Sequence, residues 1–189
     1  MGEKLKFSPT PLQGAYIVTP NLLKDNRGEF FRTYCKTEFT EIKFDKEFVQ
    51  MNHSINYRRG TMRGLHFQSP RAPEEKLIQC IRGSVYDVIV DIRKKSPTFM
   101  KYYAINLNPI DKQMIFVPAG CAHGFLTLED NSELTYSHSQ TYNPSEEKGL
   151  RFDDPMINID WPNAIEHISE RDSSHPHVGE SFKGYDYEM

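Results

Sequence analysis

The stretch KLIQCIRGSVYDVIVDI, residues Lys76–Ile92, contains the clearest β-structure signal in this sequence. Two arms rich in β-branched and apolar residues flank the dipeptide Arg82-Gly83. Glycine adopts the positive φ that a tight turn requires, and β-branched residues favour strands. The pattern predicts a β-hairpin over Leu77–Ile92.

Side chains alternate across a strand, so this hairpin would have an inward face. With a two-residue loop, Ile81 pairs with Ser84, Ile78 with Asp87, and Lys76 with Ile89. The residues expected to share one face are Lys76, Ile78, Cys80, Val85, Asp87 and Ile89. A lysine and an aspartate among apolar neighbours are costly unless they pair or take part in chemistry. Both alternatives, a structural ion pair and a functional site, stay open on this pattern.

On either side of this stretch, short apolar runs closed by Gly, Pro, Asn or Asp recur at intervals of roughly ten residues, which is typical of a sandwich or barrel. Further strands are expected at Gly14–Pro20, after a turn within Asp25–Tyr34, and at Glu47–Asn52, Thr61–Phe67, Met100–Leu107, Gln113–Val117, Gly124–Thr127 and Glu133–Tyr142. Helices are expected only at Lys36–Phe44 and Asn163–Ser169. The sequence therefore predicts an all-β, jelly-roll antiparallel barrel with a few short helices, in a single domain spanning residues 1–189.

Composition narrows the class of protein. Charged residues make up 26% of the chain and the formal net charge is −3, which excludes the basic character of a nucleic-acid-binding protein. The three cysteines, without CxxC spacing, indicate reduced thiols and a cytoplasmic protein. No run approaches the roughly 20 apolar residues of a membrane span, and the N-terminus lacks an apolar signal region. The final stretch, SFKGYDYEM, is either a loose tail or a segment that packs on a partner.

Several catalytic classes lack their motifs. The only HxH is His175-Pro176-His177, for which the sequence indicates no accompanying carboxylate, so no metal site is expected. Phosphate-binding glycine loops and a serine nucleophile elbow are missing. Cys121, two residues before His123, is interpreted as a structural thiol. What remains is acid–base chemistry by His66, Lys76 and Tyr136 with a carboxylate.

Four motifs resemble the dTDP-4-dehydrorhamnose 3,5-epimerase family. They are RGLHFQ (Arg63–Gln68), KLIQCIRGSVYDVIVDIRKKSPTF (Lys76–Phe99), FVPAGCAHGF (Phe116–Phe125) and IDWP (Ile159–Pro162), in family order from about Tyr16 to about Pro176. The resemblance implies a cupin-like jelly roll that forms a homodimer through exchanged strands. It also implies a nucleotide-linked 4-keto-6-deoxyhexose as substrate and no metal or organic cofactor.

The resemblance also implies residue roles. His66 would be the base that removes the proton at C5 and then C3, oriented by Asp172, while Lys76 would stabilise the enolate oxygen. Tyr136 would be the acid that returns a proton from the opposite face. Other implied substrate positions are Arg27 and Arg63 at the phosphates, Tyr142 stacked on the nucleotide base, and Gln50, Asn52, Asp87, His123, Glu147 and Arg171. These roles are chemically consistent, because a base near neutrality needs help at the developing oxyanion.

Three positions depart from the family pattern. Arg32 stands where Glu is usual, Met51 interrupts a QDN triplet, and Thr141 replaces a second Tyr. If the family's Glu accepts the thymine N3–H, a donor at Arg32 favours cytosine, whose N3 is an acceptor. Arg32 is therefore a candidate contact to the base of a CDP-sugar, unless it points elsewhere.

The leading hypothesis is an isomerase that inverts C3 and C5 of a dTDP-linked 4-keto-6-deoxyhexose through an enolate. Alternatives within the class are an enzyme for a CDP-linked sugar and one that inverts only C3 or only C5. An alternative of another class is a non-catalytic sugar-nucleotide-binding cupin, which would retain Arg27, Arg63 and Tyr142 but lose the base or the acid. A sugar ketoisomerase on the same fold is a further alternative, which the RGLHFQ context fits less well.

Overall fold

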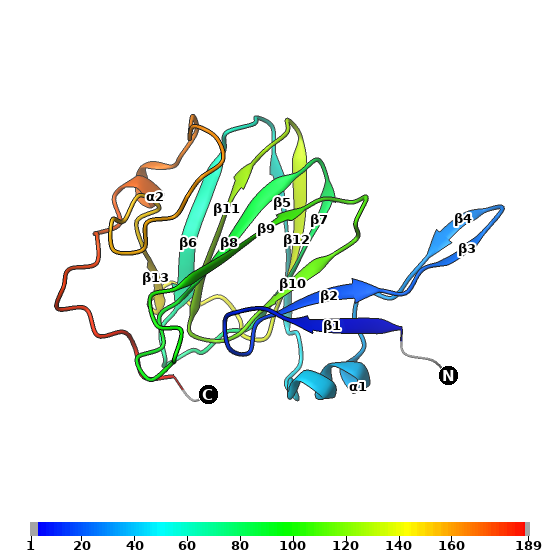
Figure 1. Cartoon of the computed structure of the whole chain (residues 1–189), viewed down its shortest axis with the longest axis horizontal. Coiled ribbons are helices and arrows are strands. Elements are labelled where there is room, and N and C mark those ends of the chain that lie inside the picture. The colour runs from blue at the N-terminus through cyan, green and yellow to red at the C-terminus, as the bar shows by residue number, and fades with distance from the viewer. Residues whose placement is uncertain (1–3, 188–189) are drawn as a thin grey trace.

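Two antiparallel sheets face each other in the computed structural model, which describes residues 4–187 (Figure 1). The first sheet contains, in spatial order, β1 (Leu5–Pro9), β2 (Tyr16–Pro20), β10 (Met114–Val117), β7 (Lys76–Arg82), β12 (Ser132–His138) and β5 (Gln50–Asn56). The second contains β13 (Glu147–Gly149), β6 (Met62–Gln68), β11 (Cys121–Thr127), β8 (Val85–Asp91) and β9 (Tyr102–Leu107). The predicted all-β jelly roll is confirmed.

The remaining strand pair forms an arm. Strands β3 (Leu23–Asp25) and β4 (Gly28–Phe30) pair only with each other and project away from the two sheets (Figure 1). The predicted turn and strand within Asp25–Tyr34 belong to this arm. Its tip turns at Asn26-Arg27, and Gly28 follows with a φ of 134°, a conformation that favours glycine.

The predicted hairpin is wrong, although both of its strands exist. Strand β7 lies in the first sheet between β10 and β12, whereas β8 lies in the second between β11 and β9. The turn at Gly83, with a φ of 71°, therefore carries the chain from one sheet to the other. A local pattern of two β-rich arms around a glycine cannot distinguish a hairpin from two strands on opposite sides of a core.

The predicted inward set is nevertheless correct, because both sheets direct alternate side chains into the gap between them. Ile78 and Cys80 from the first sheet and Val85 and Ile89 from the second belong to one buried apolar cluster. Each fully buried aliphatic side chain stabilises the fold by about 1.5–3 kcal/mol. This cluster forms the floor of the interior, and the polar members of the set lie beside it.

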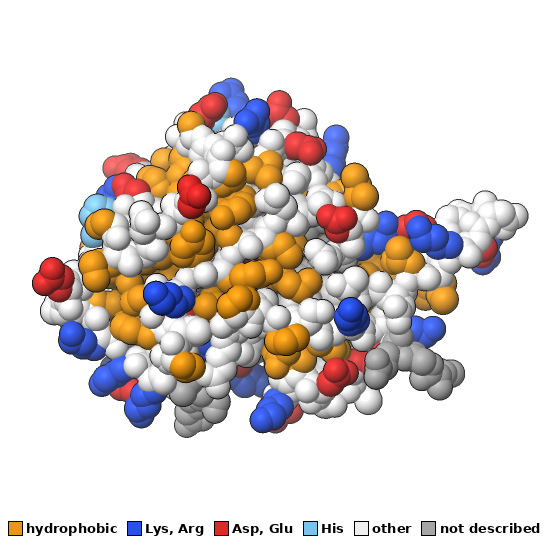
Figure 2. Space-filling model, in the orientation of Figure 1, with side chains coloured by type: hydrophobic (Ala, Val, Ile, Leu, Met, Phe, Trp, Pro, Cys, Tyr) orange, Lys and Arg blue, Asp and Glu red, His pale blue; other side chains and the backbone are white. Residues whose placement is uncertain are grey.

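Each sheet also has a covered outer face. Aromatic rings from the segment after the arm, including Phe39 and Phe44, pack on Phe116 of the first sheet. The C-terminal segment, residues 150–187, packs on the second sheet, and Figure 2 shows hydrophobic side chains gathered between that segment and β8 and β9. Tyr187 is buried there and donates a hydrogen bond to the carbonyl of Gln68. The described part of the final stretch therefore packs on its own chain, and residues 188–189 lie outside the described residues.

The helices are short. The expected helix at Lys36–Phe44 is confirmed as α1 (Lys36–Phe39) followed by a 3-10 turn, η1 (Thr40–Ile42). The helix expected at Asn163–Ser169 is wrong, since that segment is irregular and α2 spans Glu170–Ser173, with Ser169 as its N-cap. None of the helices found among residues 4–187 has the length and apolar character needed to cross a membrane.

Candidate active site

A cavity of about 290 Å³ lies between the inner faces of the two sheets. Strands β5, β7 and β12 supply one wall, and β6 and β11 supply the other. The structure places nine of the predicted site residues on its lining: Gln50, Asn52, Arg63, His66, Lys76, His123, Tyr136, Tyr142 and Glu147. Asp172, Asp87 and Arg171 lie behind or beside these residues, as described below.

His66 on β6 is held by a buried carboxylate from the distant helix α2. Its Nε2 lies 2.8 Å from Asp172 Oδ1, and Asp172 Oδ2 accepts the backbone N–H of Gly64 at 3.1 Å. Burial alone would raise the pKa of Asp172, but the hydrogen bond to His66 and the charges around it hold that pKa below its ordinary value. An ionised Asp172 accepts the Nε2–H of a neutral His66, which leaves the lone pair on Nδ1 for a proton.

Gly64 permits this arrangement. Its φ is 118°, and a Cβ at this position would lie 2.5 Å from the Cα of Gly124 on β11. Any larger residue would push β6 and β11 apart. The glycine in the RGLHFQ motif thus sets the close approach of the two strands that carry His66 and His123.

Tyr136 stands on the opposite wall, on β12. Its hydroxyl lies 3.2 Å from Ser54 Oγ on β5, and burial raises the pKa of the phenol. At neutral pH Tyr136 therefore keeps its proton and can donate it. A carboxylate-bound histidine on one sheet and a protonated phenol on the other give the cavity a base and an acid on opposite walls.

Lys76 is paired with Glu74 rather than with Asp87. Its Nζ lies 3.3 Å from Glu74 Oε2, and Glu74 Oε1 lies 2.7 Å from His138 Nδ1. His138 Nε2 lies 3.2 Å from Asn52 Nδ2. Burial would raise the pKa of Glu74, but His138 and Lys76 hold it below its ordinary value. The Lys76 ammonium therefore sits on the cavity wall with its counter-charge beside it.

Asp87 instead holds His123. Asp87 is fully buried, and its Oδ2 lies 2.9 Å from His123 Nε2. His123 and His66 are directly opposite each other in the β11–β6 ladder, so both imidazoles face the cavity from adjacent strands. Lys76 and Asp87 therefore do not pair with each other, and each has a separate partner at the same cavity.

The cavity rim carries a basic and aromatic group of residues. Arg171 pairs with Glu147 at 2.6 Å, and the Tyr142 hydroxyl also donates to Glu147. The Tyr142 backbone N–H donates to Gln50 Oε1 at 2.9 Å. Arg63 donates to Asn56 at 2.6 Å from the inner wall. Two guanidinium groups and an exposed phenol ring suit an anionic ligand that carries a planar base.

Two predicted site residues lie away from this cavity. Arg27 is at the tip of the β3–β4 arm and pairs with Asp25 at 2.6 Å. Arg32 follows the arm and pairs with Glu38 at 2.8 Å. The arm carries Arg27 outward (Figure 1), and Arg32 is held at Glu38 of α1, so neither arginine lines the cavity of its own chain.

The sequence interpretation missed several neighbours of the site. Ser54, Glu74 and His138 all line the cavity. His138 could have been found, since it follows Tyr136 by two residues on the same strand face. Glu74 lies in a loop, where no periodicity marks an inward direction.

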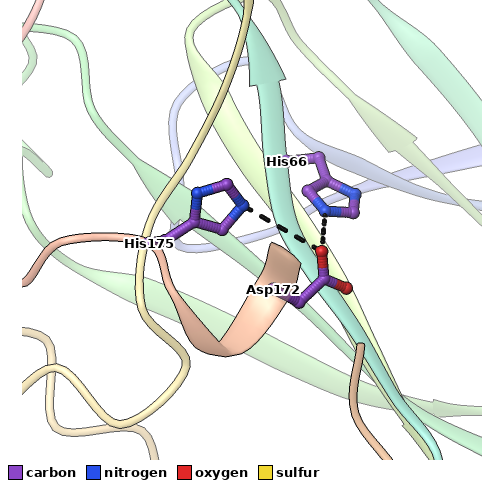
Figure 3. A group of neighbouring side chains, drawn as sticks. All are labelled: His66, Asp172 and His175. Atoms are coloured by element: carbon purple, nitrogen blue, oxygen red, sulfur yellow. Dashed lines mark hydrogen bonds and ion pairs between the residues drawn. The ribbon is translucent and has the colours of Figure 1, made fainter. Parts of the chain in front are cut away.

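The expectation that no carboxylate accompanies His175-Pro176-His177 is wrong. His175 Nε2 lies 4.0 Å from Asp172 Oδ1 (Figure 3). His177 Nε2 lies 3.0 Å from Asp153 Oδ1. The fold brings the C-terminal loop to helix α2 and to residue 153, which spacing along the chain does not show.

The site has the arrangement of an acid–base enzyme for an anionic small molecule, because a histidine paired with a carboxylate faces a phenol across one cavity. Residues 9–180 match the family model described as dTDP-4-dehydrorhamnose 3,5-epimerase. The dTDP-4-dehydrorhamnose 3,5-epimerase of Methanothermobacter thermautotrophicus is 40% identical over 159 residues, covering 84% of this chain and 85% of that protein. The chain belongs to the dTDP-4-dehydrorhamnose 3,5-epimerase family.

Solved structures agree with this assignment. The Legionella pneumophila dTDP-6-deoxy-D-glucose-3,5-epimerase in complex with dTDP-4-keto-L-rhamnose superposes with a TM-score of 0.90 at 29% identity, covering 98% of this chain and 100% of that one. A 3′-monoepimerase of Streptomyces bikiniensis in complex with dTDP-quinovose gives a TM-score of 0.81 at 31% identity, covering 89% and 86%. Both two-carbon and one-carbon epimerases thus resemble this chain.

Replacing Glu74 by Gln tests the charge balance on the cavity wall. The amide still accepts from His138 but leaves Lys76, which is 8% exposed, without its counter-charge. We expect urea denaturation at pH 7 to show a loss of about 3 kcal/mol in unfolding free energy. Because the folded pKa of Glu74 is lowered from 4.5, this contribution is present above that value and is lost as pH falls through the folded pKa.

The matched control is Glu75→Gln. Glu75 pairs with the half-exposed Lys46, 2.8 Å away, and does not line the cavity. Its other oxygen accepts from Ser139 Oγ, a bond that the amide oxygen of Gln can keep. Its replacement should cost under about 1 kcal/mol. Equal losses in the two variants, or a Glu74→Gln loss that persists at pH 3, would contradict the assigned pairing.

Proposed function

We propose that this chain, as one domain spanning residues 1–189, is an epimerase for dTDP-4-keto-6-deoxyglucose or a close relative. It inverts C3 and C5 through an enolate and uses no metal or organic cofactor. The observation that carries this proposal is the placement of the His66–Asp172 pair and of Tyr136 on opposite walls of one cavity. Inversion requires that a proton leave one face of the sugar and return to the other.

The reaction follows from these positions. His66 removes the proton on the carbon next to the ketone, and the electron pair moves onto the 4-keto oxygen. Lys76 stabilises the enolate oxygen that forms. Tyr136 then donates its proton to the opposite face of the same carbon, and the two groups exchange protons with solvent before the next turnover. Asp172 keeps His66 in the tautomer that accepts the proton.

The nucleotide portion is assigned to the rim. Arg63 and Arg171 contact the phosphates, because guanidinium groups bind phosphate oxygens in a bidentate way. Tyr142 stacks on the base, and Gln50, Asn52, His123, Asp87 and Glu147 position the remaining polar groups directly or through a neighbour. The dTDP nucleotide is favoured over CDP because Arg32, on which the CDP alternative depends, pairs with Glu38.

We further propose a cytoplasmic homodimer in which the arm reaches the second copy. The arm exposes apolar side chains, with Leu23 52% and Phe30 72% exposed, and strand β5 exposes Met51 at 75%. Arg27 stands at the arm's tip, away from the cavity of its own chain. An exchanged arm would bury these side chains and would bring Arg27 to the phosphates in the cavity of the other copy.

Replacing His66 by Ala tests the assigned base. In heavy water, wild type should introduce deuterium at C3 and C5 of dTDP-4-keto-6-deoxyglucose, as measured by NMR. The variant should lose at least about 10²-fold of this exchange, while its dTDP affinity by calorimetry stays within about threefold because Arg63 and Tyr142 remain.

The outcomes separate the alternatives. Deuterium only at C3 or only at C5 would identify a one-carbon epimerase, and tighter binding of CDP than of dTDP would assign a cytidine nucleotide. Tight dTDP binding with no deuterium incorporation in wild type would favour a non-catalytic binder. Undiminished exchange in His66→Ala would overturn the choice of base.

Mixing two inactive variants tests the arm. If Arg27 serves the other copy, a mixed dimer of Arg27→Ala and His66→Ala chains contains one complete site. Refolding the two together should restore up to about a quarter of wild-type activity, since half of the dimers are mixed and each has one of two sites. Arg82→Ala is the control for the loss of a surface arginine, and it should keep wild-type activity without any partner variant. No recovery from the mixture would contradict arm exchange.

A further inference from the structure

One more histidine, His175, lies beside the His66–Asp172 pair and takes no part in the proposed reaction. His175 lies beside Asp172 with its Nε2 4.0 Å from Asp172 Oδ1, too far for a hydrogen bond. This nitrogen is buried and has no hydrogen-bond partner among the described residues. Figure 3 shows both imidazoles pointing toward the same carboxylate oxygen. Two imidazole nitrogens and one carboxylate oxygen, all within 4.8 Å of one another, converge there.

Each of the three side chains is held in place by the fold. His66 is fixed by strand β6. The backbone N–H of Asp172 donates to Ser169 Oγ, and the Asp172 carboxylate accepts from the backbone N–H of Gly64. The His175 ring rests on Gly149, where any Cβ would overlap it. Gly149 is the ladder partner of His66 across β13 and β6, so this contact sets His175 beside His66. A site built in this way loses little side-chain freedom when a ligand binds.

We propose that His66, Asp172 and His175 bind a zinc ion. Zinc takes imidazole nitrogen and carboxylate oxygen at about 2.0–2.2 Å, with water in a remaining position. Ligand atoms within 4.8 Å of one another reach such distances from a common centre with small side-chain shifts. Two histidines with one carboxylate favour a borderline cation, whereas magnesium prefers an all-oxygen set.

Zinc at this position switches off the proposed base; this consequence rests on the proposed function. An imidazole that coordinates through Nε2 carries its proton on Nδ1. The Nδ1 lone pair of His66, which takes the sugar proton, is then occupied. Asp172 at the same time gives its Oδ1 to the metal and ceases to orient His66. The site therefore acts as an inhibitory metal site within the catalytic pair.

Calorimetric titration of the metal-free protein with zinc chloride tests the site without any substrate. We expect one zinc per chain in wild type, with no heat from magnesium chloride. His175→Gln removes one ligand, leaves the His66–Asp172 pair in place, and should weaken zinc binding by at least about tenfold. The matched control is His177→Gln, from the same HPH motif, whose partner is Asp153; it should bind zinc as wild type does.

Deuterium exchange on the sugar nucleotide provides the second readout. Zinc should inhibit wild type and His177→Gln, EDTA should restore their activity, and His175→Gln should resist inhibition. Absence of zinc binding in wild type, or equal zinc affinity in wild type and His175→Gln, overturns the site. Zinc binding that depends on His175, in a protein with no exchange activity, supports the site and separately refutes the proposed epimerase reaction.

Discussion

The Asp172 carboxylate connects parts of the chain that are far apart in sequence, and the site depends on it. One oxygen accepts from His66, 106 residues earlier, and the other accepts from the backbone of Gly64. These two bonds join the short helix α2 to strand β6 of the second sheet. The tautomer of the proposed base depends on this carboxylate, and His175 lies beside it.

Carboxylate partners also hold other polar side chains of the cavity. The cavity contains Lys76 and His123, both buried, and each has a carboxylate partner within hydrogen-bond or ion-pair distance. Removing one member of such a buried pair is costly because the other charge or polar group is left unsatisfied. Paired side chains are therefore rigid as well as polar. In the proposed reaction, that rigidity presents the base, the cation and the acid to a small substrate without rearrangement.

Much of the fold was predictable because strand patterns are local. The alternation within Lys76–Ile92 identified two buried strands and the side chains that face inward, and the scarcity of helical periodicity identified the fold class. Which strands pair with each other was not predictable, since the turn at Gly83 crosses between sheets rather than closing a hairpin. The pairing of Lys76 with Glu74 was missed for a related reason, because Glu74 lies in a loop where no periodicity applies.

The site residues likewise differ in whether a local sequence pattern could indicate them. His66, Lys76 and Tyr136 stand out on strands, but Asp172 was found only through the family resemblance, and no local pattern indicates that His175 lies beside it. The arm shows a further limit, because a single chain places Arg27 and Arg32 away from its own cavity. A residue that acts on a second copy, as proposed for Arg27, has no signature in the geometry of one copy.

In the proposed reaction the two sheets contact opposite faces of the sugar. The second sheet carries the base, His66, and the first sheet carries the acid, Tyr136. Turnover of Tyr136→Phe in heavy water tests this arrangement directly, because His66 alone can remove a proton and return a deuteron to the same face. We expect recovered substrate to carry deuterium with its configuration retained, while inverted product falls by at least about 10²-fold. Inversion at the wild-type rate in this variant, or loss of deuterium incorporation together with inversion, would contradict the account.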